Sequence, residues 1–236
     1  MIKLYMPPGT PWGLPNLSPF GTKLATYLRI AGWPYETRPA DFRRAPKGKI
    51  PYVQLDGKLL GDSQLIIEEL ERRRGGSMDT ALTANQRATG HAVQRMLDEA
   101  FYFVLVHNRW ADDAGWDLYR PVIGAIMPAP VRLILPLVRR SVRKSLITQG
   151  HGRHSEAEIM ALGIKDMNAL AAIIGDNNYL LGDVPSTYDA SAFAAVHGLL
   201  AFPLDSPLRR FVQESKILLG YRDRVWQKWF PELVNA

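Results

Sequence analysis

Ser18 lies at the start of a predicted helix, where a hydroxyl group can bind an anion. The sequence SPFGTK begins at Ser18 and follows the loop PPGTPWGLPNL. Pro19 suits the first helical position because its missing N–H has no partner there, which makes Ser18 the N-cap. In one interpretation the hydroxyl only accepts from amides of the first turn. In the other, the hydroxyl and the helix dipole stabilise a bound thiolate and lower the pKa of its thiol.

The backbone of Ile50 is a second candidate binding group. The segment Lys49–Val53 opens a pair of strands that turns at Asp56-Gly57. Proline at the start of a strand is tolerated at a sheet edge. If the Ile50–Pro51 bond is trans, Pro51 is a plain edge proline. If it is cis, the N–H and C=O of Ile50 face outward and can pair with an extended peptide ligand.

The third feature is the pair Asp62-Ser63, which stands before the apolar run LIIEEL. Either residue can cap the helix that this run predicts. A hydroxyl and free amides at a helix N-terminus can also hold a carboxylate, and an acidic side chain beside them can hold an ammonium group. The pair therefore has a structural and a binding interpretation.

These features fall in a first half of mixed secondary structure. Strand patterns cover 2–6, 35–40 and 51–60, and helical patterns cover 23–32 and 62–74. The order is β-α-β followed by β-β-α, which predicts an α/β domain with a mixed four-stranded sheet over residues 1–76. Gly75-Gly76 and the polar residues up to Thr83 form the predicted linker.

The second half, residues 84–236, is predicted to be an all-helical domain. Val93, Leu97 and Phe101 have helical spacing in its first segment. The expected helices cover 84–112, 130–147, 155–175, 187–200 and 207–228. The segment 121–138 is apolar, but its four prolines and Arg132 favour proline-broken buried or interfacial helices over a membrane span.

Composition limits the chemistry further. The chain has 236 residues and no cysteine, which excludes disulfides, a cysteine-ligated zinc and a cysteine nucleophile. Any thiol must therefore come from outside. The N-terminus MIKLYMPPGTPW has no secretory pattern, so we expect a soluble, cytoplasmic protein.

The chain has a net charge of +6, with local basic clusters at 72–74 and 139–144. Such clusters are typical of solvated helix faces, so we do not expect nucleic-acid binding, and peripheral membrane contact is the weaker interpretation. His151 and His154 lack a third ligand and are interpreted as a solvated loop, not a metal site.

Three stretches resemble the glutathione-transferase superfamily: SPF…K, KIPYVQLDGKLLGDS and YLLGDVPSTYDASAFAAV. The resemblance covers nearly the whole chain and implies a thioredoxin-like N-terminal domain that binds glutathione, followed by a helical-bundle domain. Ser186 and Asp189 have capping-box spacing, which is a folding element in this family.

By resemblance, Ser18 is the residue that activates the thiol of glutathione. The backbone of Ile50 would pair with the cysteinyl unit, and Pro51 matches the cis proline of the superfamily. The remaining glutathione contacts are assigned to Lys49 for the glycyl carboxylate and to Asp62 and Ser63 for the γ-glutamyl group. No metal is required.

The phrases WGLPNLSPF, YLRIAGWPYE, LILPLVRR and QGHGRHSEAEI resemble bacterial members of the branch that includes metaxins and failed-axon-connections proteins. Many of these carry cysteine where this chain has Gly21. Its absence argues against disulfide exchange and leaves conjugation, isomerisation, dehalogenation or lyase chemistry. Some eukaryotic members are interaction proteins, so a non-catalytic scaffold is the alternative.

The second substrate is expected to be a small electrophile in a pocket beside the thiol. The predicted wall of this pocket consists of Trp12, Tyr102, Phe103, His107, Arg109 and Trp110. For the residues of the helical half the alternative is ordinary core packing. For Trp12 the alternative is an aromatic contact that holds down the long loop. Many relatives form two-fold dimers, and the sequence leaves open whether this chain forms a homodimer, because the long loop and the proline-broken segment could block or redirect that contact.

Overall fold

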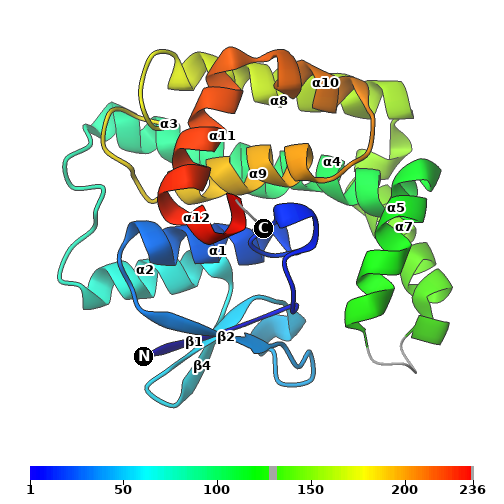
Figure 1. Cartoon of the computed structure of the whole chain (residues 1–236), viewed down its shortest axis with the longest axis horizontal. Helices are drawn as coiled ribbons and strands as arrows, with labels where there is room; N and C mark the ends of the chain where they lie inside the picture. Colours follow the sequence, from blue (N-terminus) through cyan, green and yellow to red (C-terminus); the bar gives the residue numbers. More distant parts are fainter. Residues whose placement is uncertain (128–131, 235–236) are drawn as a thin grey trace.

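The computed structural model describes residues 1–127 and 132–234 (Figure 1). Its first part contains a four-stranded mixed sheet in the order β2-β1-β3-β4. The strands are β1 (Ile2–Met6), β2 (Tyr35–Pro39), β3 (Tyr52–Leu55) and β4 (Lys58–Gly61). β1 is parallel to β2 and antiparallel to β3, and β3 is antiparallel to β4. The predicted sheet and its hairpin are confirmed.

Helices α1 (Pro19–Ile30) and α2 (Ser63–Arg73) lie between the sheet and the helical half (Figure 1). Apolar side chains of both helices pack with Leu4 and Val53 of the sheet. α1 is buried from Gly21 to Leu28 because α9 (Asp189–Ala201) covers its other side. The helix that begins after Ser18 is thus enclosed by both halves of the molecule.

The helical half follows residue 83. Its first helical stretch runs from Ala84 to Ala111, as predicted, but it includes π-helical turns at Met96–Phe101 and His107–Ala111. This stretch contains α3 (Ala84–Arg95) and α4 (Tyr102–Val106). The helices that follow it, besides α9, are α5 (Asp113–Ile126), α7 (Leu135–Gln149), α8 (Glu156–Ile174), α10 (Pro207–Glu214), α11 (Lys216–Trp229) and α12 (Pro231–Val234). The fold class, a thioredoxin-like domain followed by an all-helical part, is confirmed.

Three details of the predicted helices are corrected. The segment 207–228 is not one helix, because Ser215 separates α10 from α11 and caps α11 by accepting from the Leu218 amide. The first part of α5, residues 113–120, was not predicted as a helix, and Pro121, where the segment 121–138 of proline-broken helices was expected to begin, lies inside α5 without ending it. Residues 130–131 of the predicted helix 130–147 lie outside the described residues, and α7 begins at Leu135.

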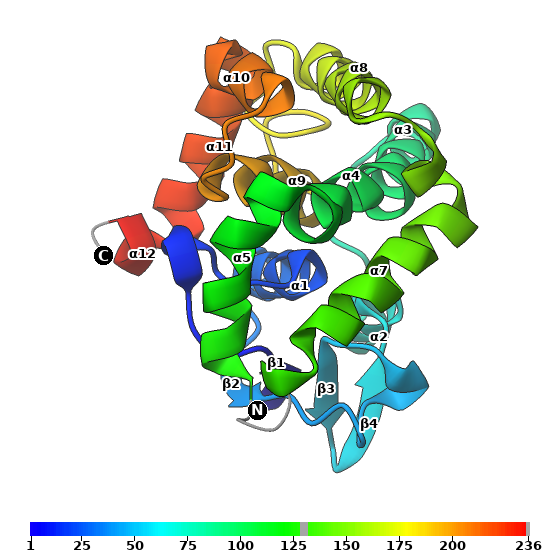
Figure 2. The ribbon, with the colours of Figure 1, turned by 90° about the vertical axis from the view of Figure 1, so that its right-hand side faces the viewer.

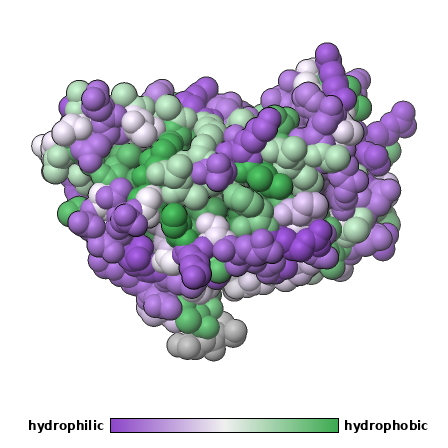
Figure 3. All heavy atoms as spheres, turned by 90° about the horizontal axis from the view of Figure 1, so that it is seen from above, coloured by the Kyte–Doolittle hydropathy of each residue, from purple (hydrophilic) through white to green (hydrophobic). Residues whose placement is uncertain are grey.

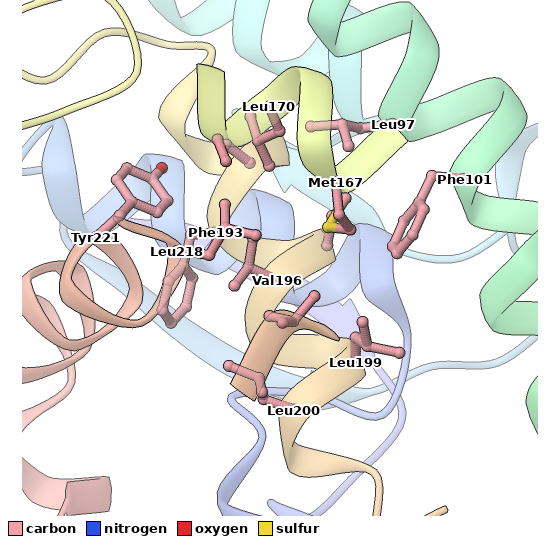
Figure 4. Close-up of a cluster of buried hydrophobic side chains, with 14 of the residues drawn as sticks. Leu97, Phe101, Met167, Leu170, Phe193, Val196, Leu199, Leu200, Leu218 and Tyr221 are labelled. Atoms are coloured by element: carbon pink, nitrogen blue, oxygen red, sulfur yellow. The ribbon is translucent and has the colours of Figure 1, made fainter. Parts of the chain in front are cut away.

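The core of the helical half surrounds α9. Every residue from Asp189 to Leu200 is buried, so this part of α9 has no face exposed to solvent. Phe193, Val196 and Leu199 of α9 pack with Met167 of α8 and with other apolar residues (Figure 4). This central helix also contacts α1, so the core connects directly to the element that carries Ser18.

Seen from above, hydrophobic groups gather in the middle of the molecular surface, with hydrophilic groups at its margins (Figure 3). Some large apolar side chains are well exposed, among them Leu133 and Leu137 near the start of α7. In the part of the chain that the structure describes, no helix is both long and apolar enough to cross a membrane.

Candidate functional site

A cavity of about 1010 Å³ lies between the sheet domain and the helical half. α5 and α7 stand beside α1 and extend toward the sheet on this side of the molecule (Figure 2). Five of the predicted site residues line the cavity, namely Ser18, Ile50, Tyr102, Arg109 and Trp110. Most other lining side chains are apolar, for example Leu105, Ile123 and Val138. The cavity can therefore hold a small apolar molecule next to Ser18.

Ser18 is the N-cap of α1, as its sequence context predicts. Its hydroxyl accepts from the Gly21 amide at 3.3 Å, and Pro19 occupies the first helical position. The side chain is half-buried at the edge of the cavity. The positive end of the helix dipole and the hydroxyl are thus available to an anion bound at this point.

Asn16 holds Ser18 in place and was missed by sequence reasoning. Its Nδ2 donates to the Pro7 carbonyl at 2.7 Å, and its Oδ1 accepts from the Ser18 amide at 3.0 Å. A Cβ atom on Gly21 would lie 2.9 Å from the Asn16 Cγ, so the Asn16 side chain fits only beside glycine. The sequence offered only an asparagine two residues before a helix cap, and its burial is visible only in the structure.

The loop before Ser18 is attached to the helical half at several points. The Trp12 ring meets Phe202 edge-on with centroids 5.2 Å apart, and His197 Nε2 lies 3.4 Å from the Gly13 carbonyl oxygen. Arg109 Nη1 donates to the Leu17 carbonyl at 2.9 Å. Trp12 does not line the cavity, so its observed contact is the one that holds down the loop.

The Ile50–Pro51 peptide bond is cis. Ile50 lines the cavity, and within the described residues its amide and carbonyl make no backbone hydrogen bond. Its backbone is therefore free to pair with an extended ligand. The exposed Lys49 lies beside it but outside the cavity lining.

Asp62 caps α2 and keeps one carboxylate oxygen free. Oδ1 accepts from the Gln64 and Leu65 amides at 3.0 and 3.3 Å, while Oδ2 has no hydrogen bond to the described residues. The backbone φ of Asp62 is +81°, which is rare for a residue other than glycine. Asp62 and the buried Ser63 do not line the cavity, so the structure does not place them against its wall.

The helical wall of the cavity differs in part from the predicted one. Phe103 and His107 do not line it. Phe103 packs on Tyr102 with ring centroids 5.2 Å apart, and burial lowers the pKa of His107. Tyr119 of α5 was missed because this part of α5 was not predicted; its ring packs on Trp110 with centroids 5.1 Å apart. The cavity wall thus depends on a helix whose pattern was hidden by Pro121.

Arg109 is the one charged group of this wall among the predicted residues. It is 4% exposed, and its Nη2 donates to the Gly198 carbonyl at 3.1 Å. Burial lowers the pKa of its guanidinium, and Tyr119 and Tyr102 oppose this effect. Arginine nevertheless stays protonated in proteins. The cavity therefore contains a fixed positive charge.

Comparison with known proteins identifies the family. Residues 19–115 match the model of the glutathione S-transferase N-terminal domain, and residues 163–225 match that of the C-terminal domain. The isoprene-epoxide–glutathione S-transferase of Rhodococcus sp. (strain AD45) is 32% identical over 226 residues, which cover 92% of this chain and 95% of that protein.

Other relatives belong to the branch indicated by the sequence. Failed axon connections of Drosophila melanogaster is 30% identical over 98% of this chain, which spans 59% of that protein. Metaxin-3 of Xenopus laevis is 25% identical over 94% of this chain and 75% of its own length. Among solved structures, the beta-etherase of Sphingobium sp. strain SYK-6 has the same fold, with a TM-score of 0.64, 18% identity and coverage of 99% of this chain and 98% of that one.

The match to both domain models and the 32% identity over nearly the full length of the epoxide-conjugating enzyme agree with the observed fold. The chain belongs to the glutathione S-transferase family.

Proposed function

We propose that this protein is a glutathione transferase that joins the thiol of glutathione to a small electrophile, with an epoxide as the substrate class. The observation that carries the proposal is the position of Ser18. This residue caps α1 and at the same time borders the large apolar cavity. A thiol bound at the helix start would therefore face a space that can hold an apolar electrophile.

Glutathione is proposed to bind along the segment before β3. The free amide and carbonyl of Ile50 suit an extended peptide, and the free Oδ2 of Asp62 suits the ammonium group of the γ-glutamyl unit. Ser63, Pro51 and Lys49 remain proposed contacts on the basis of family resemblance. No metal is required by this arrangement.

Ser18 is proposed to activate the thiol. Its hydroxyl can donate to the sulfur, and the N-terminus of α1 favours the anionic form. Both effects lower the pKa of the thiol, so more thiolate is present at neutral pH. The thiolate then attacks the electrophilic carbon without a separate general base.

The epoxide is suggested by the relative that shares 32% of its residues with this chain and whose name gives isoprene epoxide as its substrate. A small epoxide is largely apolar, which agrees with the leucine, isoleucine and valine side chains of the cavity. Opening of its ring by glutathione gives a β-hydroxy thioether.

Replacement of Ser18 by alanine tests the proposal. A hydrogen bond to a charged group contributes roughly 1.5–3 kcal/mol, so we expect kcat to fall about 10- to 100-fold. Glutathione affinity, measured by calorimetry, should change much less. The matched control is Ser155→Ala, which removes an exposed N-cap of α8 that does not line the cavity, and should leave kcat unchanged.

Other outcomes would favour other functions. Wild-type protein that does not bind glutathione would contradict the transferase proposal. A scaffold is the second candidate because α7 combines exposed Leu137 and Ile147 with exposed Arg140, Arg143 and Lys144. Salt-sensitive sedimentation with anionic vesicles, without thiol binding, would support it. Halide release or isomerised product without net conjugation would indicate a dehalogenase or isomerase.

A further inference from the structure

Arg109 is a buried positive charge without a negative partner. Its side chain lines the cavity and is held by neutral carbonyl groups of Leu17 and Gly198. No carboxylate of the described residues pairs with it, and its Nε is buried without a hydrogen-bond partner. A buried charge is costly unless it is paired. This charge is therefore suited to an anion that the protein itself does not supply.

Two tyrosine hydroxyl groups complete this part of the cavity. Tyr102 and Tyr119 both line it, and neither hydroxyl makes a hydrogen bond to the residues that the structure describes. Arg109 and Tyr119 pack on the same ring: the Arg109 Cζ lies 5.5 Å from the centroid of Phe202, and the Tyr119 ring lies 6.4 Å from it. Tyr102 stands seven residues before Arg109 on the same helical stretch and lines the same cavity. Burial raises the pKa of Tyr119 to about 12, so its hydroxyl remains a proton donor at neutral pH.

The rest of the wall makes these donors more effective. Leu105, Ile123 and Val138 give the same cavity an apolar wall, and electrostatic interactions are stronger in apolar surroundings than in water. Donors that are already fixed in position stabilise charge that develops during a reaction, at no cost of reorganisation. A few polar groups in an apolar cavity also set the orientation of a ligand.

We infer that Arg109, Tyr102 and Tyr119 form an oxyanion site for the oxygen atom released when glutathione opens an epoxide. The inference rests on the proposed transferase function. As the thiolate forms its S–C bond, the adjacent C–O bond breaks and its electron pair stays on oxygen. This oxygen accepts hydrogen bonds from the guanidinium and takes the hydroxyl proton of a tyrosine. Water then returns a proton to the tyrosinate, and the proton lost earlier from the thiol of glutathione balances the reaction.

Arg109 also holds the loop before Ser18 through its hydrogen bond to Leu17. Its replacement alone therefore does not separate the proposed stabilisation of the oxygen anion from the attachment of this loop. The tyrosines do separate them, because their hydroxyl groups bond to nothing in the described protein. Tyr102→Phe and Tyr119→Phe keep the rings and remove only the donors. Tyr179→Phe is the matched control, since its hydroxyl contacts Lys228 and lies outside the cavity lining.

The experiment compares isoprene epoxide with iodomethane as electrophiles for the same protein. The iodide released from iodomethane takes no proton. We expect at least one of three variants, Tyr119→Phe, Tyr102→Phe or the double variant, to lower kcat/KM for the epoxide at least 10-fold. The same variant should change kcat/KM for iodomethane less than twofold. Tyr179→Phe should change neither. Equal losses with both electrophiles, or no loss with the epoxide, would overturn the inference.

A binding measurement tests the positive charge without catalysis. Wild-type protein without glutathione should bind 1-naphthylacetate at least about fivefold more tightly than the neutral 1-naphthylacetamide. Arg109→Met should abolish this preference and Arg109→Lys should keep part of it. No preference in the wild type would overturn the anion site. Wild-type protein that conjugates neither electrophile would instead overturn the transferase proposal, and with it the assignment to an epoxide oxygen.

Discussion

The charge state of His197 affects the stability of the contact between α9 and the loop before Ser18. Its ring stacks on Phe193 at 4.9 Å and lies 4.1 Å from the ring centroid of Trp226, and its Nε2 faces the Gly13 carbonyl. Burial lowers the pKa of His197 to about 4, although the contact with Gly13 acts in the opposite direction. A neutral histidine is therefore part of the contact between α9 and the loop before Ser18.

We expect this histidine to make the protein less stable in mild acid. The unfolded imidazole binds a proton near its ordinary pKa of 6.5, and the folded one only near 4. Stability therefore rises with pH across this window and is lost as the pH falls through it. Between pH 7.5 and 5.0 the loss from His197 is about 2 kcal/mol. Urea unfolding of wild type and His197→Gln at both pH values measures it; equal pH dependence in the two proteins would contradict the assignment.

At the scale of elements, the start of α9 depends on Asp189. Its Oδ2 accepts from the amide and the hydroxyl of Ser186, each at 2.8 Å, and its Oδ1 accepts from the Leu180 amide at 2.8 Å and the Tyr221 hydroxyl at 3.0 Å. The spacing of Ser186 and Asp189 predicted a capping box. The Ser186 hydroxyl instead donates to the carboxylate, so only the acidic half of the box is formed.

Asp189→Ala should lower the free energy of unfolding by about 3 kcal/mol, because it leaves the buried amides of Ser186 and Leu180 without an acceptor, while the Tyr221 hydroxyl keeps only the Asp189 backbone carbonyl. Urea unfolding measures the change. The control is Asp183→Ala, an exposed aspartate that accepts from Asn178, which should change stability by less than about 0.5 kcal/mol. Equal effects of both variants would show that α9 does not depend on this carboxylate.

The sequence predicted those elements whose signals are local. The alternating strand 2–6, the turn at Asp56-Gly57 and the proline after Ser18 each define a structure without help from distant residues. The first part of α5 was missed because Pro121 disfavours a helix locally, whereas burial of Trp116, Tyr119 and Ile123 stabilises it.

The same limit applies to the candidate site. The cap at Ser18 and the Ile50–Pro51 bond, trans or cis, could be considered from the sequence because capping and X-Pro geometry are local properties. The roles of Asn16 and Tyr119, and the missing counter-charge of Arg109, depend on contacts between segments far apart in the sequence. No spacing rule contains this information.

At the scale of the whole molecule, a buried ion pair joins the two halves. Lys23 of α1 is 2% exposed, and its Nζ lies 2.5 Å from Asp98 Oδ2 in the helical half. The same ammonium donates to Gln64 of α2 at 3.3 Å, and Gln94 donates to that side chain as well. The first turn of α2, next to Asp62 and Ser63, is thus connected to the helical half through Lys23 and directly through Gln94.

Lys23→Met should lower the free energy of unfolding by about 3 kcal/mol, because it leaves the partly buried carboxylate of Asp98 without the ammonium group that pairs with it. The double variant Lys23→Met/Asp98→Leu removes both charges and should recover at least half of this loss. Thermal and urea unfolding measure both proteins. A double variant less stable than the single one would show that the pair is not coupled in this way.

The close fit of Asn16 beside Gly21 also limits how sequences of this kind can evolve. Cysteine at position 21 would collide with the Asn16 side chain, so that change is tolerated only after Asn16 has been replaced. Loss of Asn16 removes the acceptor for the Ser18 amide and the contact with Pro7. The two positions are therefore epistatic. A lineage that passes between a cysteine and a glycine at position 21 must cross an intermediate in which neither arrangement is complete.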